Sequence, residues 1–271
     1  MSFKLIEVLK RMFGIFDRKG KIKRYLIDYL EESNLAQSAL SLEQELESPG
    51  HKVENEIKVH IIGDSHAHGF TGTPSGTYGI GLETNFPWTS YSLSTISTKE
   101  LLRFKWVLLE KLFVKYNIEV GSSLMFTFGE PECRWHVFRE AARLKIGTDE
   151  ELINLADEYV TAAFEIFNRL LNLGYKVIIW GGQPTPEEER VFLQEIPFLG
   201  SAKSRNLLTK YWHEAMEKYS LSKSIPFISI YEQMEGKDGS ALEFYMEDSV
   251  HVKTTLLQGF LATKLYELKI I

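Results

Sequence analysis

Cysteine is almost absent from this sequence of 271 residues, which contains Cys133 alone. A single cysteine excludes a framework of intramolecular disulfides, so we expect a reducing compartment, the cytoplasm by default. The sequence also lacks any run of about 18 apolar residues, the length that a membrane-spanning helix needs. Its first residues mix apolar and basic side chains without an uninterrupted apolar core, so they do not predict a secretory signal.

A broad basic surface is missing as well. The formal net charge is -6, and the longest basic stretch, DRKGKIKR, is confined to Asp17–Arg24. Nucleic-acid binding needs a stripe of lysine and arginine, so we expect no nucleic-acid partner and favour a small or neutral substrate. What is present is a hydrophobic content of 44%, enough for the core of one α/β domain. Composition does not indicate an oligomeric state.

The chain divides into two parts by composition. Residues 1–55 are charged, have helical periodicity and end at the breaker Pro49-Gly50, which predicts an N-terminal helical appendage. Its first residues would also suit a membrane surface or a partner's groove. Residues 56–271 form the second part, in which short β-branched and aromatic runs alternate with segments of helical length.

Four of the short runs predict buried strands, and four of the longer segments predict helices. The strands are expected at 57–62, 122–129, 175–182 and 225–230, and the helices at 98–116, 148–174, 202–220 and 252–268. Thr148 and Glu151 form a plausible capping box at the start of the longest helix. Alternating strands and helices predict parallel pairing, hence an α/β fold of three layers, an α/β/α sandwich with a mainly parallel sheet.

Polar residues follow two of these strands directly. Gly63, Asp64 and Ser65 come after the first strand, and Gly129 and Glu130 come after the second. Because ligands of parallel sheets bind beyond the carboxyl ends of the strands, both turns are candidates for the functional site.

Ser65 is a candidate nucleophile. A serine hydroxyl reacts only when a base accepts its proton, and a carboxylate usually orients that base. Asp248 and His251, three residues apart in YMEDSVHVK, supply both groups near the C-terminus. The chemistry would be acyl transfer, normally ester hydrolysis, with the oxyanion held by the backbone N–H of Ser65 and other donors.

These residues resemble the SGNH or GDSL-type hydrolases. GDS at 63–65 is similar to that family's nucleophile block, and DSVH at 248–251 is similar to its catalytic Asp-x-x-His. The resemblance covers residues 57 to 271. It implies a flavodoxin-like sandwich, no cofactor, no metal, and the triad of Ser65, Asp248 and His251. A looser similarity, through GDSH and GExxCR, is to bacterial members associated with glycans, which implies an O-acyl ester on a carbohydrate and its deacetylation.

The central loop departs from the family pattern. The family has an oxyanion asparagine in a Gly-x-Asn-Asp block, whereas this sequence reads FGEPECRWH at 128–136, with Pro131 in place of the asparagine. Proline has no donor to offer, so Arg134 or His136 is expected to replace it. The stretch 85–93 is expected where the family has its second glycine block. The residues expected to line the oxyanion and substrate side are Gly129, Arg134, Asp64, His66, Glu130 and His136.

Other interpretations of these residues stay open. Ser65 would also serve as a helix cap, Asp248 as another, and His251 as a surface residue. Arg134 would equally well form a salt bridge with Glu130 or Glu132. Cys133, beside a basic residue and a histidine, would be an alternative nucleophile if its thiol were activated.

Other functions stay open too. Asp64, His66 and His68 also resemble the strand-end ligands of a metal-dependent phosphoesterase, although the other ligand blocks of that family are missing. Loss of one oxyanion donor costs about 3 kcal/mol, so a catalytically impaired glycan-binding or partner-binding protein is another alternative. Transfer of the acyl group to an acceptor other than water would use the same residues.

Overall fold

The computed structural model describes residues 58–71, 80–82, 86–93, 96–186, 199–247 and 250–271. The expected helical appendage at residues 1–55 lies outside these ranges, and so does the boundary at residue 56. Both therefore stay predictions.

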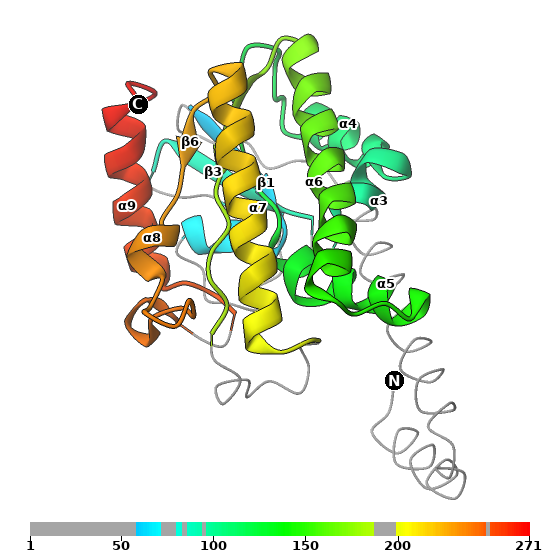
Figure 1. The fold of residues 1–271 in the computed structure, drawn as a ribbon. Coiled ribbons are helices and arrows are strands. Elements are labelled where there is room, and N and C mark those ends of the chain that lie inside the picture. The colour runs from blue at the N-terminus through cyan, green and yellow to red at the C-terminus, as the bar shows by residue number, and fades with distance from the viewer. Residues whose placement is uncertain (1–57, 72–79, 83–85, 94–95, 187–198, 248–249) are drawn as a thin grey trace, which may run out of the picture. The chain divides into compact units, whose positions relative to one another are not determined.

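A sheet of six strands lies at the centre of the described part of the chain, with the strand order β2-β3-β1-β4-β5-β6 (Figure 1). The strands are β1 (Val59–Gly63), β2 (Ile80–Leu82), β3 (Trp88–Ser92), β4 (Ser123–Thr127), β5 (Lys176–Trp180) and β6 (Phe227–Ile228). All neighbouring pairs are parallel except β2 with β3, which is antiparallel. The four expected strands are confirmed as β1, β4, β5 and β6.

The register brings the carboxyl ends of the central strands together. Gly63 of β1 pairs with Ser92 of β3 on one side and with Thr127 of β4 on the other. The turns that follow these strands therefore meet at one edge of the sheet. The end of the stretch 85–93 lies here, beside Gly63, as part of a strand that the sequence did not predict.

Helices occupy the segments expected from periodicity, with one division. The α-helices are α3 (Thr98–Arg103), α4 (Trp106–Lys115), α5 (Val137–Leu144), α6 (Asp149–Asn172), α7 (Ala202–Lys223), α8 (Tyr231–Met234) and α9 (Thr254–Glu267). Shorter turns are the 3-10 helices η1 (Ser65–Phe70) and η4 (Glu243–Tyr245) and the π-helix η2 (Glu132–His136). The expected helix 98–116 breaks at Phe104 and Lys105 into α3 and α4. No helix among the described residues is long and apolar enough to cross a membrane.

The predicted capping box is present at the start of α6. The Thr148 hydroxyl accepts from the Glu151 N–H, and the Glu151 carboxylate accepts from the N–H of Thr148 at 2.9 Å. These bonds satisfy two N–H groups that have no partner inside the helix.

Helices cover both faces of the sheet, because successive strand residues point to opposite sides. On one face Ile61, Met125 and Ile178 pack in a single core with Leu257 and Leu261 of α9. On the other face lies α6, whose Phe167 ring centroid is 5.6 Å from that of Phe126 in β4. Figure 1 shows α6 and α7 running side by side in this outer layer. The predicted three-layer α/β/α fold is thus confirmed.

Candidate active site

Ser65 is placed by the tight turn that ends β1. A Cβ atom at Gly63 would lie 1.9 Å from the Thr127 side-chain oxygen and 2.4 Å from its carbonyl oxygen, so only glycine fits there. Asp64 is the N-cap of η1, and its Oδ1 accepts from the backbone N–H of His66 at 2.8 Å. Ser65 is the first residue of η1 and is half-buried. Its N–H therefore has no acceptor within the turn.

His251 is presented by a short antiparallel pairing near the C-terminus. Met246 and Val252 form an isolated bridge, and the Glu247 N–H donates to the His251 carbonyl at 2.8 Å. Val252 is buried, which anchors this segment in the core, whereas His251 is half-buried.

The structure brings Ser65 and His251 together. His251 Nε2 lies 3.4 Å from Ser65 Oγ, although the two residues are 186 positions apart in the sequence. A hydrogen bond of this length is typical of an unliganded catalytic pair, which tightens when a substrate binds. Asp248 lies outside the described residues, so its role in orienting His251 stays a prediction.

His66 lies between Asp64 and the loop that carries His251. Its Nδ1 lies 2.8 Å from Asp64 Oδ1, and its Nε2 lies 3.1 Å from the carbonyl oxygen of Val250. Burial alone would lower the pKa of His66, but the Asp64 charge and hydrogen bond, together with Glu130, outweigh it and raise the pKa to about 9. His66 is therefore an imidazolium at neutral pH.

Glu130 and Arg134 form a buried ion pair next to these histidines. Arg134 Nε donates to Glu130 Oε1 at 2.5 Å, and the two side chains are 5% and 11% exposed. Burial would raise the pKa of Glu130, but the charges of Arg134, His66 and His251 outweigh it and lower the pKa. The salt bridge that the sequence left open is thus present, and an oxyanion role for Arg134 stays a prediction.

The rest of the GEPECRWH loop forms the π-helix η2, a form of helix that is frequent at functional sites. Gly129, which precedes it, has a φ of +122°, and a Cβ there would lie 2.4 Å from the Trp212 ring, so glycine is required. The His136 ring stacks on Trp135, with centroids 5.0 Å apart, and lies 6.3 Å from Tyr159 of α6. A part for His136 in binding an oxyanion stays a prediction.

Cys133 is not an activated thiol. It is 1% exposed, and burial, with the nearby charges of Glu132 and Glu130, raises its pKa well above the ordinary value. Because the thiolate is the nucleophilic form, the alternative of a Cys133 nucleophile does not fit this environment.

The proposed metal ligands do not form a common site either. Both ring nitrogens of His66 face other partners, so neither is turned to a metal that Asp64 and His68 would share. Burial, followed by the charge of His251, lowers the pKa of His68. Within the described ranges, no group of three histidine, cysteine or acidic side chains could hold a metal ion.

Gln183 is a residue of this region that the sequence analysis missed. It follows β5, is 7% exposed, and its Nε2 donates to the Val250 carbonyl at 2.7 Å. The signal for it was its place in GGQP, a polar residue just after a predicted strand, which is the same signal that singled out Ser65.

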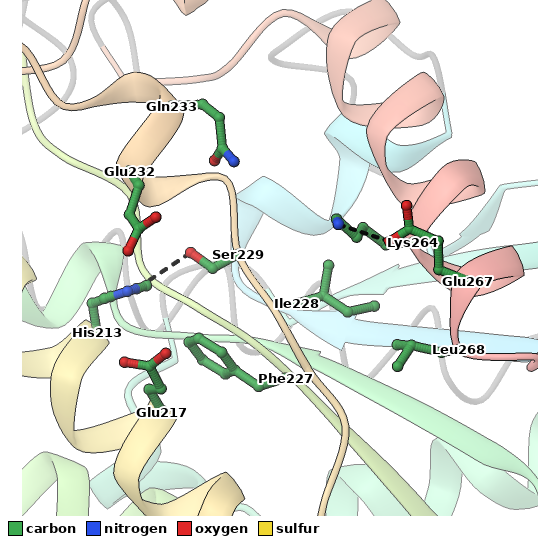
Figure 2. A pocket seen from close by; sticks show the side chains of 10 residues that line it. All are labelled: His213, Glu217, Phe227, Ile228, Ser229, Glu232, Gln233, Lys264, Glu267 and Leu268. Atoms are coloured by element: carbon green, nitrogen blue, oxygen red, sulfur yellow. Dashed lines mark hydrogen bonds and ion pairs between the residues drawn. The ribbon is translucent and has the colours of Figure 1, made fainter.

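A hollow lies away from Ser65, at the outer edge of the sheet beside β6. It has a volume of about 310 Å³ and is lined by residues of β6, α7, α8 and α9 (Figure 2). It contains another serine–histidine contact, since His213 Nδ1 lies 3.3 Å from Ser229 Oγ. None of the residues that line it belongs to the Ser65 site.

Comparison with known proteins identifies the fold. No known family's sequence profile and no curated protein matches this chain. A structure from Streptococcus pneumonia, provisionally described as a platelet activating factor, is 16% identical, covers 90% of this chain and 98% of its own, and has a TM-score of 0.57. A provisionally described acylhydrolase from Bacteroides fragilis is 15% identical, covers 87% of this chain and 97% of its own, and has a TM-score of 0.52. At these identities the likeness shows the fold alone, and it agrees with the predicted three-layer α/β/α fold.

Proposed function

We propose that this protein is a serine ester hydrolase that removes a small O-acyl group, with Ser65 as nucleophile and His251 as base. The observation that carries the proposal is the 3.4 Å approach of His251 Nε2 to Ser65 Oγ, at the edge of the sheet where ligands of this fold class bind. Both side chains are half-buried, so a substrate can reach them.

The reaction would proceed in two acyl-transfer steps. Ser65 Oγ attacks the ester carbonyl carbon while its proton passes to His251 Nε2, and the C–O bond to the alcohol breaks as His251 returns that proton to the leaving oxygen. Water then attacks the acyl-serine by the same route in reverse. Asp248 is proposed to accept from His251 Nδ1 and to keep Nε2 directed at Ser65.

The negative charge that develops on the carbonyl oxygen needs donors. The backbone N–H of Ser65 is one, because the first residue of a helical turn lacks an intrahelical acceptor. Gly129 and Arg134 are proposed to line the same side. Asp64, His66, Glu130 and His136 are proposed around the pocket, and an O-acylated carbohydrate is the substrate class that the family resemblance implies.

A fluorophosphonate probe tests the assignment directly. The probe should phosphonylate Ser65 in folded protein, and peptide mass mapping should locate the added group. Labelling of another residue, or no labelling of protein that is shown to be folded, would contradict the proposal.

A second candidate function is ligand binding without catalysis. It is favoured by the central loop, where Pro131 offers no donor and Arg134 is paired with Glu130. The two candidates differ in one outcome, since a binding protein would retain an acylated sugar unchanged whereas a hydrolase would release the free acid. Release to an added alcohol acceptor instead of water would indicate an acyltransferase.

A further inference from the structure

The carbonyl of Val250 is held by two side chains that come from different strand ends. His66 Nε2 lies 3.1 Å from the carbonyl oxygen, and Gln183 Nε2 lies 2.7 Å from it. Val250 is buried and immediately precedes His251. These two contacts, which we call the Val250 clasp, therefore fix the backbone next to the proposed base from the ends of β1 and β5.

The other side of the His66 ring faces the Asp64 carboxylate. Asp64 is 1% exposed, and its Oδ1 lies 2.8 Å from His66 Nδ1. A carboxylate and a carbonyl both accept hydrogen bonds, so both ring nitrogens of His66 must donate. Only the imidazolium form carries a proton on each nitrogen.

The charged and titratable groups around His66 favour this form. Asp64 belongs to the same turn, Glu130 comes from the end of β4, and the His251 ring lies with its centroid 4.9 Å away. Glu130 is itself paired with Arg134. Burial opposes a charged His66, and the two carboxylates outweigh that opposition.

We propose that His66 is a positioning residue, which acts by donating to the Val250 carbonyl and thereby sets the approach of His251 to Ser65. The inference rests on the proposed function, because it assigns His66 a part in the same reaction. Both ring nitrogens of His66 are bonded elsewhere, to Asp64 and Val250, so neither bonds Ser65 or His251. Its turn also carries Ser65, so one ring links the backbone of the nucleophile to the backbone of the base.

The clasp makes a prediction for pH. A neutral imidazole has one donor and one acceptor, so deprotonation of His66 leaves either Asp64 or Val250 opposite a lone pair. The folded pKa of His66, raised to about 9, lies above the ordinary value of 6.5. The clasp is therefore intact at neutral pH and is lost as the pH rises through about 9.

Two amide variants of His66 test separately its hydrogen bond to Val250 and its hydrogen bond to Asp64. In His66→Gln the amide nitrogen can occupy the place of Nε2 and still donate to Val250, whereas in His66→Asn it can occupy the place of Nδ1 and reach only Asp64. With p-nitrophenyl acetate, H66Q should lose clearly less of kcat than H66N, because its amide still donates to the Val250 carbonyl. H66N should lose about 10²-fold in kcat with little change in KM, the effect expected of a misplacement of about 1 Å.

The dependence of kcat on pH distinguishes a positioning role of His66 from a purely structural one, because a purely structural role would not change it. The wild type should lose kcat above pH 9, and H66Q should not, because its amide does not titrate. His60→Gln is the matched control, since His60 is a buried histidine bonded to Tyr91 and not part of the clasp. H60Q should keep the wild-type profile. Equal kcat values for H66Q and H66N, or an alkaline loss that persists in H66Q, would overturn the proposal.

NMR of the full chain tests the clasp without reference to activity. Nitrogen-15 spectra of the His66 ring should show both nitrogens protonated at pH 7 and a titration near pH 9. A ring that titrates near 6.5 would refute the clasp even if the ester hydrolysis is real. If Ser65→Ala leaves hydrolysis unchanged, the proposed function fails, and the NMR result still decides whether the clasp exists.

Discussion

Two serine–histidine pairs of nearly equal length lie at two strand ends of this sheet. Ser65 and His251 are 3.4 Å apart beyond β1, which lies inside the sheet, and Ser229 and His213 are 3.3 Å apart beyond the edge strand β6. Distance alone does not distinguish the two pairs, so we compare the residues that surround each of them.

The surroundings of the second pair point to a structural role. Ser229 Oγ already accepts from the Tyr231 N–H at 3.0 Å, so its hydroxyl takes part in the turn that precedes the short helix α8. Burial, and then the charge of Lys210, lowers the pKa of His213 to about 4, so this ring is a poor proton acceptor at neutral pH. The comparison teaches that the distance between a serine and a histidine does not by itself indicate catalysis, because the second pair has nearly the same distance but a serine that is bonded elsewhere and a histidine with a lowered pKa.

The largest expected effect is on turnover. Ser65→Ala should reduce kcat for p-nitrophenyl acetate by at least about 10³-fold, because a nucleophile and its base act as one unit. Ser229→Ala, the matched change in the second pair, should leave kcat within about twofold of the wild type, since Ser229 makes no part of the proposed chemistry. A large loss in S229A, or full activity in S65A, would reverse the assignment of the two pairs.

Ion pairs near the two serine–histidine contacts should differ in their contribution to stability. Arg134→Met leaves the buried Glu130 charge without its partner and should lower the free energy of unfolding by about 3–5 kcal/mol. Lys210→Met removes a bridge to Glu235 whose side chains are 54% and 28% exposed, and it should cost about 1 kcal/mol or less. Urea denaturation measures both.

The double variant E130Q/R134M provides the control for the first of these changes. It removes both charges, so it should recover part of the loss that R134M shows alone. An R134M variant as stable as the wild type would contradict the prediction, because it would show that Arg134 does not compensate the buried charge of Glu130.

The glycines at the ends of β1 and β5 should also differ in their tolerance of a methyl group. In Gly63→Ala the new Cβ meets the Thr127 backbone, which cannot move aside, so a loss of about 3 kcal/mol or more is expected. In Gly181→Ala it meets the Phe227 ring and the Ser229 side chain at 2.8 Å, which can shift, so about 1 kcal/mol is expected. Thermal or urea unfolding of the two variants would contradict this order if G181A proved the less stable.

The smallest expected effect is an opposite dependence of stability on pH. His66, with its pKa raised to about 9, stabilises the fold below pH 6.5, and that contribution is lost as the pH rises through 9. His213, with its pKa lowered to about 4, makes the fold less stable as the pH falls from 6.5 through 4. Urea denaturation at pH 4.5, 7 and 9.5 measures both effects. The wild type should lose stability relative to H66Q between pH 7 and 9.5, and relative to H213Q between pH 7 and 4.5, by at most about 1.4 kcal/mol per pH unit. If H66Q and H213Q both altered the pH dependence of stability in the same pH range, the prediction would be contradicted.

The sequence predicted the central strands and helices because their apolar residues follow a clear period. It did not predict β3, whose residues WTSYS are fully buried but mostly polar, so no hydrophobic alternation marks them as a strand. It also did not predict the break between α3 and α4, since apolar residues at helical spacing lie on both sides of Lys105.

Within the candidate site, the sequence named Ser65 and His251 because each belongs to a short motif with a chemical meaning. It could not name Gln183 or the carbonyl of Val250, because their hydrogen bonds join residues 67 and 184 positions apart, and a carbonyl has no residue type to recognise. The sequence left open whether Arg134 would bond Glu130, bond Glu132 or serve the site, and the structure pairs it with Glu130, four residues away.

The separation of 186 positions between Ser65 and His251 also bears on how the protein is made. Parallel sheets fold slowly because distant segments must meet before their contacts stabilise them. The segment with Ser65 leaves the ribosome long before the segment with His251, and domains fold as the chain emerges from its N-terminal end. We therefore expect a nascent chain to bury β1, β4 and β5 while it is still inactive. The proposed reactivity toward esters would appear only when His251 and Val252 have joined the sheet edge.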